Sequence, residues 1–183
     1  MKVSKISNLI FHNKKHYITQ KFSNKHKAVD YGTYRKKIKQ YAIEDGIITF
    51  TGLISGGKAV KIKYPRINME FMHLHLDKIL VKKGQSVNKK TAIGTTGMTG
   101  IATGIHLHLR IKDLKSNKIL DPEEYAKTYE EDNHIYYIVK KGDNLSKIGK
   151  KYKMTWQEIY DKNKEIIGNN PNLIRVGQKL FIQ

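Results

Sequence analysis

The chain has 183 residues and a hydrophobic content of 39%, enough for one ordinary domain plus a small one, which excludes a disordered chain. It contains no cysteine, so disulfides and thiolate zinc sites are excluded and any metal must be bound by His, Asp or Glu. The formal net charge of +19 favours polyanions such as nucleic acid or an anionic cell wall. Because no helix-turn-helix or RNA-binding signature accompanies this charge, we expect no specific nucleic-acid partner.

No apolar run approaches the roughly 18 residues that a membrane span needs, so no span is expected. The N-terminal residues 1–11 are followed at once by His12-Asn13-Lys14-Lys15, and no secretory signal fits there. We therefore expect a chain that stays in the cytoplasm until something else releases it.

Residues 17–23 predict a strand that enters a polar loop, and His26 and Asp30 follow. A spacing of four could place this pair on one helical face. Gly32 and the shortness of the segment favour a loop that runs into a strand instead. A His and an Asp four residues apart are also a common coincidence, so the spacing alone is a weak signal.

Three further segments predict strands. Residues 45–52 and 58–64 are rich in β-formers, and Ser55-Gly56-Gly57 between them predicts a hairpin turn. In residues 70–76, Met72, Leu74 and Leu76 fall on one face, whereas Phe71, His73 and His75 fall on the other. These histidines either lie on a half-exposed strand or meet a second pair of histidines further along the chain.

That second pair lies in residues 105–111. Ile105, Leu107, Leu109 and Ile111 alternate with His106, His108 and Arg110, so the two imidazoles point the same way, which suits a metal site. The alternative is two surface histidines on an edge strand. The Gly/Thr-rich residues 97–104 before them lack the Gly-Lys-Ser/Thr ending of a phosphate loop. Many short strands with glycine punctuation predict a mainly antiparallel β domain.

Asp121 and Pro122 predict a helix start that closes this first domain. We expect a domain over residues 1–129, an acidic linker over 130–135, and a second domain over 136–183. The second domain shows a small βααβ pattern in which Asn144 caps one helix and Thr155, with Glu158 at capping-box spacing, caps the next. The single Trp156 is expected in the core or in a groove wall.

Residues 17–126 resemble the lysostaphin-type (LytM-like) zinc peptidases that cut bacterial peptidoglycan. The resemblance lies in His26-x-x-x-Asp30, the His75-Leu76 element, the Gly97-x-Thr99-Gly100-x-x-Thr103-Gly104 segment and His106-x-His108. It implies that His26, Asp30 and His108 bind one Zn²⁺ per chain and that His75 and His106 are catalytic. Two imidazoles, one carboxylate and an open position form a catalytic zinc sphere. Either histidine could take the proton of water, and the sequence does not divide the roles.

Residues 136–182 resemble a LysM repeat, a module that binds N-acetylglucosamine-containing glycans. The resemblance rests on the segment from Tyr137 to Ile148 and on Asn170-Pro171-Asn172-Leu173-Ile174 with Gly177-Gln178. It places a glycan groove between two loops, with the binding residues Gly142, Asp143, Asn144, Leu145, Pro171, Asn172, Leu173 and Ile174. The alternative is that these residues only form turns.

His73 departs from the peptidase pattern, which usually has an aromatic residue at that position. Because alternation puts His73 on the face of His75, we expect it in the substrate groove or just behind the catalytic residues, with an ordinary surface histidine as the alternative. His12, His16 and His134 belong to no motif and are expected at the surface.

The sequence thus predicts a monomeric zinc endopeptidase that hydrolyses stem-peptide or cross-bridge bonds of peptidoglycan and is anchored to the wall by a LysM module. The lack of an export signal suggests a bacteriolytic, phage-type endolysin. Anionic wall polymers are further candidate partners. The first alternative is a non-catalytic peptidoglycan-binding or regulatory protein. The second is a protein that binds polyanions by charge alone, with an affinity that collapses in salt.

Overall fold

The computed structural model describes residues 4–129 and 135–182, and the chain divides into two compact units, residues 1–131 and 132–183. Each unit has a hydrophobic core of its own. The division falls inside the stretch 130–135 that the sequence assigns to a linker, and residues 130–134 of that stretch lie outside the described residues.

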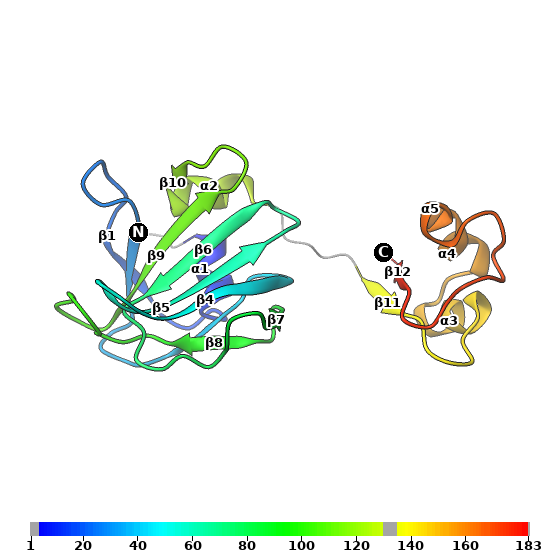
Figure 1. Ribbon diagram of the computed structural model, residues 1–183, viewed down its shortest axis with the longest axis horizontal. Coiled ribbons are helices and arrows are strands. Elements are labelled where there is room, and N and C mark those ends of the chain that lie inside the picture. Colours follow the sequence, from blue (N-terminus) through cyan, green and yellow to red (C-terminus); the bar gives the residue numbers. More distant parts are fainter. Residues whose placement is uncertain (1–3, 130–134, 183) are drawn as a thin grey trace. The chain divides into compact units, whose positions relative to one another are not determined.

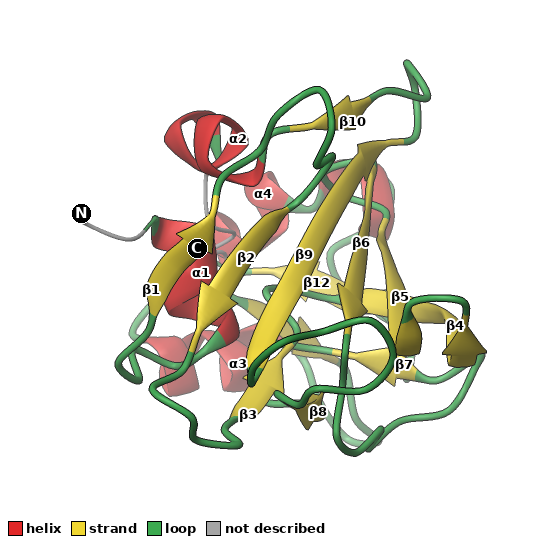
Figure 2. Cartoon of the chain, turned by 90° about the vertical axis from the view of Figure 1, so that its left-hand side faces the viewer, coloured by secondary structure: helices red, strands yellow, loops and turns green. Residues whose placement is uncertain are grey.

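The first unit is built on an eight-stranded sheet with the order β1-β2-β9-β6-β5-β4-β7, and β10 pairs with β9. Figure 2 shows β1, β2, β9 and β6 side by side. A two-stranded sheet joins β3 and β8, and the strand pairs are antiparallel, as expected. The strands are β1 (Tyr17–Gln20), β2 (Val29–Gly32), β3 (Lys39–Tyr41), β4 (Gly46–Ile54), β5 (Gly57–Tyr64), β6 (Met69–Leu74), β7 (Ser86–Val87), β8 (Ala92–Thr95), β9 (His106–Asp113) and β10 (Ile119–Leu120).

Strand β9 lies between β2 and β6 in the sheet, and Figure 1 shows it beside β6, so its histidines are not on an edge strand and that alternative is wrong. Leu107, Leu109 and Ile111 are fully buried in the main core, as the alternation predicts. Burial of such side chains stabilises the fold by about 1.5–3 kcal/mol each. This burial fixes the direction of the strand, so His106 and His108 must face the other side.

Two helices complete the first unit. The sequence did not predict α1 (Lys5–Ile10), which Ser4 caps and which buries Ile6 and Ile10 in the main core. Asp121 caps α2 (Pro122–Thr128) by accepting a hydrogen bond from the backbone N–H of Glu123, as expected. The two helices contact one another.

A small cluster of buried side chains lies on the histidine side of the sheet. It consists of Ala59, Met72 and Leu74, with Phe50 and Ile54 packed against it. Leu74 lies directly opposite His108 in the register of β6 and β9. Since directly opposed residues share a face, this cluster forms apolar ground beside the histidines.

The second unit has the expected βααβ order with one additional short helix. It contains β11 (Tyr136–Ile138), α3 (Leu145–Tyr152), α4 (Trp156–Lys162), α5 (Lys164–Ile167) and β12 (Lys179–Phe181). Asn144 caps α3 and the Thr155–Glu158 capping box begins α4, as predicted. The small core is formed by Val139, Leu145, Ile148, Ile159, Leu180 and Ile182.

Among the described residues, none of the helices combines the length and the apolar composition required to cross a membrane.

Candidate functional site

Three side chains on neighbouring segments converge at one end of β2 and β9. Asp30 of β2 lies directly opposite His108 of β9, and His26 is in the loop that enters β2, as the sequence predicts. His108 Nδ1 lies 2.9 Å from Asp30 Oδ1, and His26 Nε2 lies 3.3 Å from Asp30 Oδ2. The two nitrogens are themselves 3.3 Å apart. One ligand atom from each residue falls within 4.8 Å of the others, which is the spacing of a metal site.

The chemistry of these atoms also fits a bound cation. Among the described residues, the buried Asp30 Oδ1 has no hydrogen bond, although His108 Nδ1 is close to it. A buried carboxylate oxygen without a donor is unfavourable unless a positive charge satisfies it. Burial raises the pKa of Asp30, but the imidazoles of His108, His26 and His106 outweigh this effect and hold the pKa below its usual range. Asp30 is therefore an anion ready to bind a cation.

A backbone contact orients His26 toward this cluster. Its Nδ1 lies 3.2 Å from the carbonyl oxygen of Lys21. A carbonyl oxygen can only accept a hydrogen bond, so Nδ1 carries the proton and Nε2 presents its lone pair to Asp30 and His108. The local fold thus selects the tautomer that can ligate a metal.

His75 reaches the same place by a route that the alternation does not predict. In an extended strand it would share the core face of Phe71 and His73. The strand β6 ends at Leu74, and His75 has a φ of +63°, in the left-handed region. This turn directs the ring to the other face, where its centroid is 4.8 Å from that of His106 and 5.5 Å from that of His108.

His75 and His106 both donate their Nδ1 protons to backbone carbonyl oxygens. His75 Nδ1 is 2.9 Å from Thr99 O, and His106 Nδ1 is 2.8 Å from Gly104 O. Each Nε2 is therefore the nitrogen that keeps a lone pair. Burial lowers the pKa of His75, the hydrogen bond to Thr99 opposes this, and the charges of His106 and His108 lower it further. His75 is consequently neutral at pH 7, and it lies close to the cluster of His26, Asp30 and His108 without being part of it.

The Gly/Thr-rich segment holds His75 in this position. Thr99 Oγ1 donates to Leu76 O at 3.0 Å and accepts from Lys58 N at 2.9 Å. A Cβ on Gly100, whose φ is +73°, would overlap Gly56 O, so only glycine allows this close approach of the two turns. The sequence singled out Thr99 as part of a motif, but its role in supporting His75 appears only in three dimensions.

His73 does not line a groove, so that part of the prediction is wrong, whereas a place just behind the catalytic residues stays a prediction. Its side chain is 0% exposed on the core side of β6, directly opposite Leu109, so it is not a surface histidine either. Its Nδ1–H donates to Gln40 Oε1 at 2.7 Å, and burial lowers its pKa to about 3. The alternating pattern of β6 holds as far as His73. It fails at His75, which a continued strand would place on the same face as His73.

The three histidines that belong to no motif differ in their exposure and contacts. His12 is exposed and stacks on Tyr41, with ring centroids 3.6 Å apart. His16 is buried, which corrects the surface prediction, because its ring packs on Phe11 and its Nε2 contacts Ser7 Oγ at 3.0 Å. His134 lies outside the described residues.

The second unit has a cavity of about 290 Å³ between the two loops expected to bind glycan. It brings together Asn144, Leu145, Pro171 and Asn172, and adds Ser146 and Trp156. Trp156 is 39% exposed, as a groove wall would be. The other expected binding residues do not line this cavity: Gly142, Asp143, Leu173 and Ile174.

The role of Asp143 is visible in its hydrogen bonds. Its carboxylate accepts hydrogen bonds from Lys140 N at 2.7 Å and from Tyr137 Oη at 2.8 Å, and these bonds lower the pKa of Asp143. Asp143 thus holds its own turn together. Ile174 packs against the core of the second unit, so it too has a structural task. The turn alternative describes these two residues better than a place in the groove.

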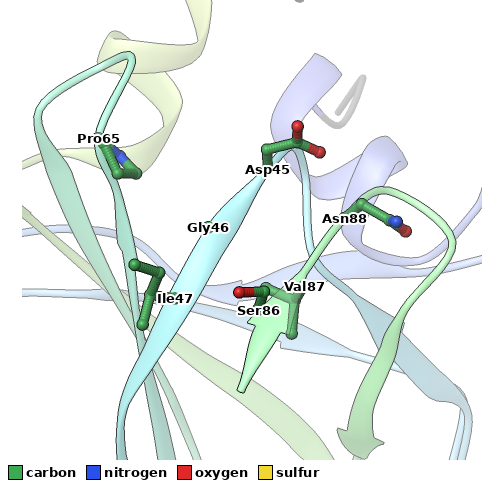
Figure 3. Close-up of a pocket in the computed structure, with 7 residues that line it drawn as sticks. All are labelled: Asp45, Gly46, Ile47, Pro65, Ser86, Val87 and Asn88. Atoms are coloured by element: carbon green, nitrogen blue, oxygen red, sulfur yellow. The ribbon is translucent and has the colours of Figure 1, made fainter. Parts of the chain in front are cut away.

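A further cavity of about 400 Å³ lies on the first unit and contains none of the expected site residues (Figure 3). It is formed near the paired ends of β4 and β7. Among its described lining residues, only Asp45 is titratable, and no histidine contributes. It offers no catalytic chemistry comparable with that of the histidine cluster.

Comparisons with known proteins agree with this division of the chain. Residues 24–122 match the family model of peptidase family M23, and residues 137–183 match that of the LysM domain. The chain is 42% identical over 72 residues to the peptidoglycan DD-endopeptidase ShyA of Vibrio cholerae, a match that covers 39% of this chain and only 16% of ShyA.

Solved structures show the same fold in the first unit. A zinc-containing peptidase from Vibrio cholerae is 31% identical with a TM-score of 0.52, and the match covers 57% of this chain and 35% of that one. The catalytic domain of the antimicrobial peptidase lysostaphin from Staphylococcus simulans is 26% identical with a TM-score of 0.55, over 68% of this chain and 99% of that domain.

Proposed function

Because this chain belongs to peptidase family M23 and carries a C-terminal LysM domain, we propose that it is a zinc-dependent endopeptidase that hydrolyses peptide bonds in bacterial peptidoglycan. The observation that carries the proposal is the convergence of His26, Asp30 and His108, with His75 and His106 beside them. The names of two similar proteins, the DD-endopeptidase ShyA and the antimicrobial peptidase lysostaphin, support the same class of reaction.

Zinc fits the donor set better than the common alternatives. Two imidazole nitrogens and one carboxylate oxygen are ligands that Zn²⁺ takes in catalytic sites, whereas Ca²⁺ and Mg²⁺ prefer oxygen atoms alone. His26, Asp30 and His108 would hold the ion. Bound there, zinc supplies a Lewis acid that activates water and polarises the scissile carbonyl.

The two further histidines supply proton transfer and charge stabilisation. His75 and His106 each present Nε2 on the metal side, since their Nδ1 protons are held by Thr99 O and Gly104 O. One can accept the proton of the attacking water and pass it to the leaving amine, while the protonated ring stabilises the oxyanion. The apolar patch around Met72 and Leu74 gives the substrate a dry surface next to these groups.

The LysM domain is proposed to hold the enzyme on the wall by binding N-acetylglucosamine-containing glycan. Its cavity lies between the two loops and is walled by Trp156 and Pro171, which suit the apolar faces of sugar rings. The bonds of the wall are thereby brought to high local concentration for the peptidase domain.

The test is digestion of purified sacculi with the full chain, with products read by mass spectrometry. New amino and carboxyl termini that vanish with a chelator and return with zinc are expected. Asp30→Ala should lose both bound zinc and hydrolysis, whereas His106→Ala should keep zinc and lose hydrolysis. His12→Gln, at an exposed histidine outside the cluster, serves as the matched control and should keep both.

Two results would contradict the proposal. Hydrolysis by Asp30→Ala at the wild-type rate would refute the assignment of the metal ligands. Sacculi that are bound by the wild-type chain without new termini would leave the alternative, a peptidoglycan-binding protein without peptidase activity.

A further inference from the structure

A cavity of about 530 Å³ in the first unit lies outside the histidine cluster, and three of its lining residues are lysines. Its lining residues are Lys14, Lys15, Thr33, Tyr34, Lys36 and Ile38. Two segments form it, one between α1 and β1 and the other between β2 and β3. No acidic residue belongs to this described lining, so the cavity carries a local excess of positive charge beside the apolar side chain of Ile38.

The three lysines are free to bind a ligand. Within the described residues, the ammonium groups of Lys14, Lys15 and Lys36 have no ion pair and no hydrogen bond, and all three residues are exposed. The next residue shows the contrast, since Lys37 Nζ is held 2.9 Å from Asp77 Oδ1. Three unneutralised cations around one cavity attract anions more strongly than the same charges scattered over a surface.

The backbone under these lysines is fixed by buried groups. Lys14 O accepts the Nδ1 proton of the buried His16 at 2.7 Å. Lys36 O accepts from Thr33 Oγ1 at 2.6 Å and from the buried Thr96 Oγ1 at 3.1 Å. The positions from which the lysines project are therefore preorganised, which reduces the entropy lost when a ligand binds.

Each lysine segment also follows a strained turn. Both residues before Lys14 have a positive φ, 47° at His12 and 59° at Asn13. The two residues before Lys36 repeat the pattern, with 52° at Tyr34 and 59° at Arg35. This conformation costs about 1 kcal/mol at residues such as Tyr34 and Arg35, whereas at His12 and Asn13 it ends α1, because their N–H groups donate to Leu9 O and Asn8 O.

An aromatic pair stands beside the cations. Tyr34 is 56% exposed and its ring centroid lies 4.7 Å from that of Tyr17, which is 42% exposed. Exposed tyrosine rings next to lysines suit a ligand that alternates anionic groups with sugar or polyol units.

We propose that this cavity is a second binding site, for the phosphodiester groups of an anionic wall polymer of the polyol-phosphate type. The lysines bind phosphate oxygens and Tyr34 packs on the intervening polyol. The choice of a wall polymer over single-stranded nucleic acid, which has similar charge and stacking properties, rests on the proposed function at the peptidoglycan wall. Through this site the first unit binds the wall independently of the LysM domain.

The test measures binding of purified poly(glycerol phosphate) to the full chain by calorimetry at physiological salt. The site variant Lys14→Gln/Lys15→Gln/Lys36→Gln should lose affinity by roughly tenfold or more, with a flatter salt dependence. Tyr34→Asn removes the ring but keeps a residue that tolerates positive φ, and should lose roughly threefold. A control variant removes the same charge at three exposed lysines elsewhere in the first unit, Lys83→Gln/Lys90→Gln/Lys118→Gln, and should lose less than about twofold.

The outcomes separate this site from the peptidase. Both triple variants should cleave a soluble peptide substrate at the wild-type rate, so a chain that binds polymer and cleaves nothing would refute only the proposed function. Equal losses in the site and control variants would show diffuse charge and overturn the site. Tighter binding of an oligothymidylate of equal phosphate number, lost in the site variant, would assign the cavity to nucleic acid and overturn the choice of ligand.

Discussion

Replacing His73 with phenylalanine should make the free energy of unfolding less sensitive to acid. Burial lowers the pKa of His73 from 6.5 to about 3, so the ring stays neutral in the folded chain at pH 5. The unfolded chain takes up a proton at this residue below its ordinary pKa. The unfolded state therefore binds more protons than the folded state between the two pKa values, and stability falls as the pH falls through that window.

The size of the effect follows from the two pKa values. The loss approaches about 1.4 kcal/mol per pH unit, and it sums to about 2 kcal/mol between pH 7 and pH 5. The variant also loses the hydrogen bond to Gln40 and leaves that amide buried, at about 1–3 kcal/mol. This second penalty is the same at both pH values. The change in unfolding free energy between pH 7 and pH 5, compared between the variant and the wild type, therefore reports the titration of His73 alone.

Urea unfolding at pH 7 and pH 5, with chelator present, measures this difference. His73→Phe should lose about 2 kcal/mol less than the wild type on acidification. The control Gln40→Met removes the hydrogen-bond partner and should keep the full acid sensitivity, because burial is what lowers the pKa of His73. An unchanged acid loss in His73→Phe would refute the reasoning. Loss of hydrolysis by that variant, with fold and zinc intact, would restore a role for His73 in the groove.

Three further changes test other parts of the structure. Thr99→Val removes the two hydrogen bonds of its hydroxyl under His75 and should slow sacculus hydrolysis by about tenfold with unchanged zinc content; loss of zinc would contradict this. Gly100→Ala, at a φ of +73° with no room for a Cβ, should lower the thermal midpoint by about 5 °C, whereas Gly104→Ala, with open space around it, should not. Trp156 is the single tryptophan, so the fluorescence of the chain should change as N-acetylglucosamine oligomers bind. Trp156→Ala should weaken this binding about tenfold. An unchanged emission spectrum during binding would place the glycan elsewhere.

Local patterns in the sequence were enough to predict the fold class, and they did so for physical reasons. Strand β9 alternates strictly, so the burial of Leu107 and Leu109 determines where His108 points. Each of these two helix caps depends on one side chain and on the backbone N–H three residues later in the chain. This is why the caps Asn144 and Thr155 could be recognised from local sequence. The family resemblance then predicted that His26, Asp30 and His108 share one metal ion, and the structure brings the candidate ligand atoms of these residues close together.

Strand alternation failed for the face of His75, and the surface prediction failed for His16, because one depends on a single backbone angle and the other on residues around α1. His75 joins the site only because its φ is positive, and no periodicity rule can show such a turn. His16 is buried because Ser7 and Phe11 of the unpredicted region around α1 receive it. His73 is buried against Gln40, which lies 33 residues away in the chain, so this contact could not be inferred from local sequence.

The pairing of β11 with β12 has a consequence for protein engineering. Tyr136 lies directly opposite Phe181, so the second unit begins and ends on adjacent antiparallel strands. Opposed residues in such a pair have Cα atoms about 5 Å apart, which is a gap that a loop of a host protein can span. With its own core, this module is suited to transplantation as a cassette into a surface loop of an unrelated protein, and not only to fusion at an end.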